Sequence, residues 1–118
     1  MPWIFENGRP IYTQILEQME QKIISGEYKA GEKLPSVREL ATQAAVNPNT
    51  MQRAMAELEN RGLVITNRTA GRTVTEDKKV LKKIKEHKAK DATEIYISQM
   101  KEMGFSKEEI IELIKKGE

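Results

Sequence analysis

The pattern of apolar and polar positions predicts a first helix near the start of the chain. After Pro10, apolar residues recur at intervals of four, the spacing that places side chains on one face of an α-helix. Pro10 suits the first helical position, because its missing N–H group would be unpaired there anyway. Gly26 can end this helix in the left-handed conformation. The apolar stripe consists of Ile11, Ile15, Met19 and Ile23.

Two shorter helices follow, and only a tight turn separates them. Ser36 and Glu39 have the spacing of a capping box, which predicts a helix at about residues 37–44. Asn47 is expected to cap the next helix, with Pro48 in its first turn. Two short helices joined by so few residues must cross steeply, which is the helix-turn-helix arrangement. The buried face of the later helix is predicted to be Met51, Ala54, Met55 and Leu58.

Two short β-branched segments after the third helix predict a hairpin. They read LVITN and GRTVTE, and the sequence RTAG between them can turn the chain. Three helices followed by a hairpin is the element order of a winged helix-turn-helix domain. We therefore predict a mostly α fold with a small β-hairpin, with the winged helix-turn-helix domain at residues 1–76 and a helical tail at residues 77–118.

The tail has more apolar residues than it can bury by itself. Ser106 and Glu109 form another capping box before a last short helix, and Gly104 is expected to end the helix before it. A segment of about 42 residues cannot enclose its own core, so its apolar faces should pack on the first domain or on another subunit. The apolar positions are Val80, Leu81, Ile84, Ile95, Ile97, Met100, Met103, Ile110, Ile111, Leu113 and Ile114.

Composition narrows the class of protein. Charged residues make up 32% of the 118 residues and aromatic residues 5%, which indicates a soluble, mostly helical protein. Cysteine is absent, so disulfides and thiolate metal sites are excluded. No apolar run approaches the roughly 18 residues of a membrane span, and the start MPWIFENGRP is not a signal peptide. We therefore expect a cytoplasmic protein with no membrane partner.

The start of the third helix carries residues suited to binding DNA. In a helix-turn-helix the second helix of the pair enters the major groove. Asn and Gln can bond adenine edges there and Arg can pair with guanine, and no acidic residue occurs from Val46 through Ala56. The alternative is that Asn47 is only a cap and its neighbours are ordinary surface. The candidates are Asn47, Asn49, Thr50, Gln52 and Arg53.

Other basic residues could contact the DNA backbone. Arg38, beside the cap Ser36, could clamp a phosphate, although an exposed arginine paired with a nearby acid would look the same. A basic hairpin tip can follow phosphates or enter the minor groove. Seven lysines and one acid lie from Lys78 to Lys90; a solvated helix face is the ordinary explanation of such a run. The tip candidates are Arg68, Thr69, Gly71 and Arg72.

No set of residues supports an enzyme. The single histidine, His87, lies among lysines, and the chain has no Cys or His cluster for a metal. It also lacks a Gly-rich phosphate loop and a nucleophile with a neighbouring base. We expect no catalysis, no cofactor and no metal. The remaining alternative is a winged-helix module that binds another protein, which the near-neutral net charge of +2 keeps open.

Two long segments resemble the GntR family of bacterial transcription regulators. They read PIYTQILEQMEQKIISGEYKAGEKLPSVRELA and VNPNTMQRAMAELENRGLV, and the resemblance spans about residues 9–74. The short helical tail is similar to that of the YtrA-like subfamily. The resemblance implies a dimeric winged-helix repressor in which Arg38, from the REL motif, contacts DNA. It implies the same for the polar residues that open the recognition helix, Asn47, Asn49 and Thr50, with Gln52 following.

The resemblance also shows one departure, at the tip of the wing. The family usually has two glycines spaced Gly-x-Gly there, whereas this chain has Thr69-Ala70-Gly71. The first glycine is missing, and Arg68 and Arg72 could compensate through their charge.

A homodimer formed by the tail is the arrangement that these observations favour. It would place two recognition helices about one DNA turn apart, roughly 34 Å, and predicts a pseudo-palindromic operator. The expected partners are double-stranded DNA and a second copy of the chain. An unknown small-molecule effector, if one exists, would have to act at the dimer interface or between the tail and the DNA-binding domain.

Overall fold

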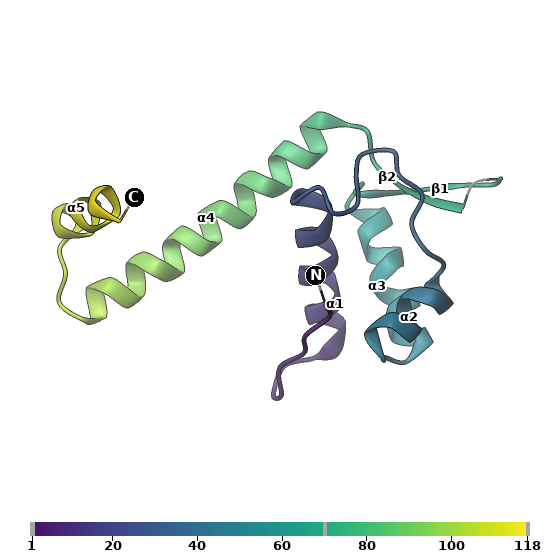
Figure 1. The fold of residues 1–118 in the computed structure, drawn as a ribbon, viewed down its shortest axis with the longest axis horizontal. Coiled ribbons are helices and arrows are strands. Elements are labelled where there is room, and N and C mark those ends of the chain that lie inside the picture. The colour runs from purple at the N-terminus through teal and green to yellow at the C-terminus, as the bar shows by residue number, and fades with distance from the viewer. Residues whose placement is uncertain (1, 70, 118) are drawn as a thin grey trace. The chain divides into compact units, whose positions relative to one another are not determined.

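The computed structural model describes residues 2–69 and 71–117 (Figure 1). The chain divides into two compact units, one reaching to Lys82 and the other starting at Lys83. The predicted fold, mostly α with a small hairpin, is confirmed. In chain order the elements are α1 (Ile11–Ile24), α2 (Val37–Ala44), α3 (Pro48–Asn60), β1 (Val64–Asn67), β2 (Gly71–Val74), α4 (Lys78–Glu102) and α5 (Lys107–Lys116).

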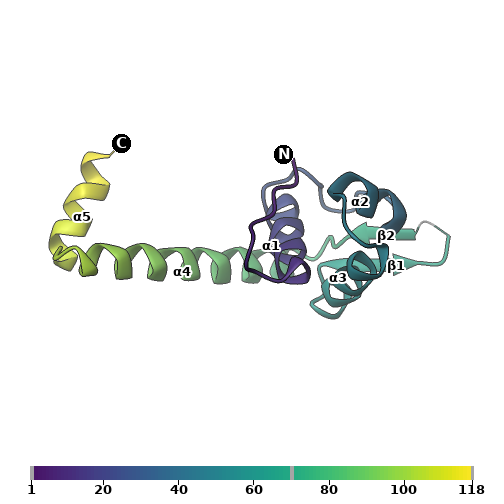
Figure 2. The same cartoon turned by 90° about the horizontal axis from the view of Figure 1, so that it is seen from below.

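Helix α1 packs its apolar stripe against α3, and the two helices lie side by side in both views (Figures 1 and 2). Of the predicted stripe, Ile15 and Met19 are fully buried, whereas Ile11 at the helix start is 38% exposed. Pro10 precedes the first helical residue instead of occupying it, a difference of one position. Its carbonyl accepts the hydrogen bond from the N–H of Gln14 (3.3 Å), so Pro10 still starts the helix.

Two glutamines of α1 hold the segment that precedes the helix. The Gln18 side chain accepts from the N–H of Ile4 (3.1 Å) and donates to its carbonyl (2.6 Å). The Gln14 side chain does the same for Glu6, at 2.7 and 3.0 Å. Gln14 is only 2% exposed, and these bonds satisfy its buried amide.

The helix-turn-helix consists of α2 and α3, and its turn contains a left-handed residue. The capping box of α2 is present: Glu39 N–H donates to Ser36 Oγ (3.1 Å), and Ser36 N–H donates to Glu39 Oε1 (3.2 Å). Ala45 has φ +56°, and the N–H of Val46 bonds back to the carbonyl of Ala41 (3.0 Å). This turn closes α2 and redirects the chain, at a cost of roughly 1–2 kcal/mol for a residue with a Cβ.

The predicted hairpin is confirmed, and a third segment extends it. Strands β1 and β2 pair antiparallel, with Val64 opposite Val74. The other edge of β2 is bonded to the loop before α2: Val74 N–H donates to the Glu32 carbonyl, and Leu34 N–H donates to the Arg72 carbonyl, both at 2.9 Å. Val64 and Val74 are each 1% exposed, so the base of the hairpin closes the core of the first unit.

The second unit consists of the larger part of α4 together with α5. Gly104, with φ +92°, ends α4, and Ser106 and Glu109 form the predicted capping box of α5. Met100 and Ile110 are the buried apolar side chains of this unit within the described residues. None of the described helices is both long enough and apolar enough to cross a membrane.

Candidate nucleic-acid interface

One face of α3 is polar and exposed over its first two turns. Asn49, Gln52 and Arg53 are exposed, and positions three or four apart share one face of a helix. Ala56 continues this face with a side chain too small to obstruct a groove. Thr50 lies at the edge of the face and is half-buried. The opposite face consists of the four predicted core residues, Met51, Ala54, Met55 and Leu58, all fully buried.

Two of the predicted DNA-binding residues also serve as helix caps. The Asn47 side-chain oxygen accepts from the N–H of Asn49 (2.7 Å), and Ser36 Oγ caps α2 as described above. Each keeps further hydrogen-bonding capacity, because an amide retains its NH₂ group and a hydroxyl its proton. The first turn of α3 contains no acidic residue, so the positive end of the helix dipole is available to an anion.

The arginines of the two helices have different surroundings. Arg38 is exposed, and within residues 2–69 and 71–117 its side chain makes no ion pair. In this structure no acidic side chain of the described residues lies within ion-pair distance of Arg38. Arg53 lies over the ring of Tyr12, with the guanidinium carbon 4.4 Å from the ring centre. A cation–π contact of this kind does not use the N–H groups of the guanidinium, so they keep their capacity for hydrogen bonds.

The two arginines of the wing are not equivalent. Arg68 and Thr69 are exposed at the tip, whereas the side chain of Arg72 is 23% exposed and its Nε donates to Glu59 Oε1 (2.6 Å). Gly71 has φ +76°, so its backbone uses the freedom that glycine provides. The middle residue of the tip, Ala70, lies outside the described residues.

Sequence reasoning missed two residues that shape this surface. Glu59 of α3 binds both strands of the hairpin, through Thr66 and Arg72. Lys33 pairs with Thr73 in an isolated bridge and adds an exposed cation beside the wing. No sequence motif points to either residue. Glu59 resembles any acidic residue on a helix surface, and Lys33 lies in a stretch that is recognisable only as a loop. The contacts depend on which strand lies next to which helix, and spacing does not encode that.

Comparison with known proteins assigns the family. Residues 11–74 match the family described as bacterial regulatory proteins, gntR family. The chain belongs to the GntR family. The matched range runs from the first residue of α1 to the last residue of β2, so it coincides with the winged helix-turn-helix elements.

Relatives of this GntR-family chain extend the similarity to the tail. An uncharacterized HTH-type transcriptional regulator, YhcF of Bacillus subtilis (strain 168), is 41% identical over 111 residues, covering 94% of this chain and 92% of the relative. The HTH-type transcriptional repressor YtrA of the same organism is 47% identical over 73 residues, covering 62% of this chain and 56% of YtrA. A GntR family transcriptional regulator from Listeria monocytogenes has a similar structure, with a TM-score of 0.86 and 46% identity over 95% of this chain and 98% of that one.

The geometry and the comparisons agree on the general function. The chain is a transcriptional regulator of the GntR family with a DNA-binding helix-turn-helix domain. The roles of the individual residues described above stay predictions, because the similarity covers the fold and the sequence but not the contacts with DNA.

Proposed function

We propose that this GntR-family chain is a homodimeric repressor that binds a pseudo-palindromic operator. The observation that carries the proposal is the polar face of α3, formed by Asn49, Gln52 and Arg53. Amide and guanidinium groups at the start of a recognition helix match the donor and acceptor pattern of base edges in the major groove. The alternative of a protein-binding module fits this face less well, because interface cores are depleted in charged residues and enriched in aromatic ones.

The remaining predicted residues surround this face. In the proposal, Ser36 and Arg38 hold a phosphate beside the start of α2, while Asn47 and Thr50 contact the backbone or bases beside the start of α3. Arg68, Thr69 and Gly71 bring the wing to the neighbouring groove. The DNA-binding domain is then residues 1–76 and the dimerisation tail is residues 77–118.

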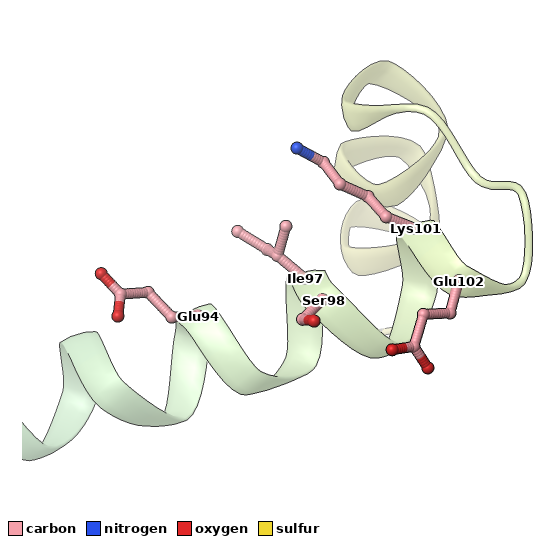
Figure 3. A pocket seen from close by; sticks show the side chains of 5 residues that line it. All are labelled: Glu94, Ile97, Ser98, Lys101 and Glu102. Atoms are coloured by element: carbon pink, nitrogen blue, oxygen red, sulfur yellow. The ribbon is translucent and has the colours of Figure 1, made fainter.

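Exposed apolar side chains of the second unit support the dimer. Six large apolar residues there are at least 38% exposed, and a surface of this kind marks a contact site when it is continuous. An open hollow of about 480 Å³ lies along α4, where Ile97 stands between Glu94 and Lys101 on one side of the helix (Figure 3). A second copy is the occupant that we propose for these surfaces. The six exposed residues are Ile95, Tyr96, Met103, Ile111, Leu113 and Ile114.

Selection from random duplex DNA tests the operator. The full chain should enrich one sequence with two half-sites in inverted orientation, their centres about 10 base pairs or a multiple of one helical turn apart. Its affinity for the selected duplex should fall as salt rises, with a slope of about −0.9 per phosphate contact in a plot of log affinity against log salt. Enrichment of a single unrepeated half-site would contradict the dimeric arrangement, and no enrichment at all would contradict sequence-specific binding.

Substitutions in α5 test the dimer separately from the DNA. The double variant Leu113→Glu and Ile114→Glu should shift the mass measured by sedimentation from dimer to monomer, because it places two charges in a surface that the partner would desolvate. Both side chains are exposed in the single chain, at 42% and 57%, so the helix content should stay the same. Glu112→Lys is the control, since it changes the charge of the same helix without altering its apolar surface. A wild-type chain that is monomeric at micromolar concentration would refute the dimer.

A further inference from the structure

We propose that Glu59 is a positioning residue that fixes the wing against the recognition helix and holds Arg72 away from the DNA. The proposal rests on the proposed function, because it divides roles within the same DNA-binding surface. Three observations support it. One carboxylate contacts both strands of the hairpin, this contact lies just beyond the apolar core, and the other wing arginine, Arg68, has no such anchor.

A single oxygen of Glu59 makes both contacts. Glu59 lies in the last turn of α3, and its Oε1 accepts from Thr66 Oγ1 on β1 and from Arg72 Nε on β2, the latter at 2.6 Å. Thr66 and Arg72 face each other directly across the hairpin. The carboxylate therefore fixes both strands to the helix at the same level of the ladder.

The position of this contact follows from the alternation of side chains along a strand. Val64 and Val74 form the buried pair at the base of the hairpin, and side chains two residues further along point to the same face. That next pair is Thr66 and Arg72, which lies beyond the reach of the apolar core. Glu59 continues the attachment of the wing by one step towards its tip. Without it, the outer half of the wing would be held only by the pairing of its two strands and by the backbone bonds between β2 and the loop before α2.

Electrostatics separates the two arginines of the wing. The hydrogen bond from Thr66, and next the one from Arg72, lower the pKa of the Glu59 carboxyl below its ordinary value, so Glu59 is ionised at neutral pH. This carboxylate holds the Nε of Arg72 and offsets the charge of its guanidinium, which weakens the attraction of Arg72 for a DNA phosphate. Arg68 is exposed, and its side chain makes no ion pair with any residue in the part of the chain that the structure describes. Arg68 is therefore the wing arginine that meets the DNA.

The same helix carries both the reading face and the anchor of the wing. Glu59 follows Gln52 by seven residues, which is about 10 Å along an α-helix. Because a helix of this length is stiff, fixing the wing to its last turn also fixes the wing relative to the side chains that read the major groove. The angle between the two DNA-contacting elements then depends on Glu59.

Hydrogen exchange of the DNA-free protein tests the anchor. Glu59→Ala should speed exchange of the hairpin amides about tenfold, the size expected for the loss of a charge-assisted hydrogen bond, while the amides of α1 stay as protected as before. Glu57→Ala is the matched control, because Glu57 is an acid of the same helix whose partner is Arg61 of α3's own C-terminus (2.9 Å). Equal exchange of the hairpin in both variants would overturn the proposal.

The salt dependence of binding tests the division between the two arginines. The probe is the duplex selected by the wild-type chain, and each variant loses one positive charge from the same hairpin. Arg68→Gln should reduce the slope of log affinity against log salt by about 0.9, because one phosphate contact is lost. Arg72→Gln should weaken binding up to about tenfold with the slope unchanged. A reduced slope in Arg72→Gln would show that Arg72 contacts a phosphate and would refute its capture by Glu59.

The two measurements keep the inference separate from the proposed function. If no duplex is selected, the proposed function fails, and hydrogen exchange still decides whether Glu59 anchors the wing. If a duplex is selected but the hairpin is unaffected by Glu59→Ala, the proposed function stands and the anchor is refuted.

Discussion

Arg38→Ala and Asn49→Ala should each weaken binding of the selected duplex by about 5- to 150-fold. This range corresponds to about 1–3 kcal/mol for one contact to a base edge or a phosphate. Arg38 has no ion pair among the described residues and is exposed beside the start of α2, so its charge is available to a phosphate. Asn49 lies at the start of the polar face of α3, where an amide can bond an adenine. Titration of labelled duplex at one fixed salt concentration measures the effect.

The two substitutions should differ in what they change besides affinity. Loss of a phosphate contact at Arg38 weakens binding to all sequences and lowers the salt slope by about 1, whereas loss of a base contact at Asn49 relaxes the preference at one position of each half-site. Lys107→Ala, which removes a positive charge at the start of α5, is the control for a charge outside the DNA-binding domain. Wild-type affinity in both variants would show that these residues are ordinary surface.

Leu58→Ala should cost about 2–5 kcal/mol of the free energy of unfolding, the range for truncating a buried leucine. Leu58 is fully buried on the face of α3 that opposes the polar one, so the substitution leaves a cavity in the core of the first unit. A domain of this size has a total stability of about 5–15 kcal/mol. The urea concentration at the midpoint of unfolding should therefore fall steeply. The slope of the unfolding free energy against urea concentration should stay the same.

The control for this substitution lies on the other side of the same helix. Gln52→Ala removes an exposed side chain and should change the stability by no more than about 0.5 kcal/mol. A Leu58→Ala variant with the wild-type urea midpoint would mean that this part of α3 is not the centre of the core. The comparison also separates loss of fold from loss of DNA contacts when binding is measured.

The elements of the fold could be predicted because their signals are local. The capping box of Ser36 and Glu39, and the cap and proline at Asn47 and Pro48, define helix starts through interactions within four residues. The predicted range of the second helix, residues 37–44, is the range that the structure has. The periodic apolar stripes also decide which faces are buried, since they determine what each helix can pack against.

Features that depend on neighbours distant in the sequence could not be predicted. The left-handed conformation of Ala45 has no signal in its residue type, because glycine and asparagine are the usual residues there. The sequence suggested that Arg68 and Arg72 act alike at the tip, yet Arg72 bonds to Glu59, thirteen residues away. Helical periodicity alone was enough to predict the polar face of α3. To predict the contacts of the wing, one would also need the register of the hairpin and its position on α3.

The pairing on both edges of β2 has a consequence for engineering the wing. One edge is bonded to β1 and the other to residues 31–34, so an insertion in either neighbour would shift the register of the central strand. At the tip, Arg68 and Thr69 are exposed, and changes of loop length at such a turn carry only a small entropic penalty. Designers who wish to change the wing should therefore graft new sequence at this tip and leave the loop before α2 at its present length.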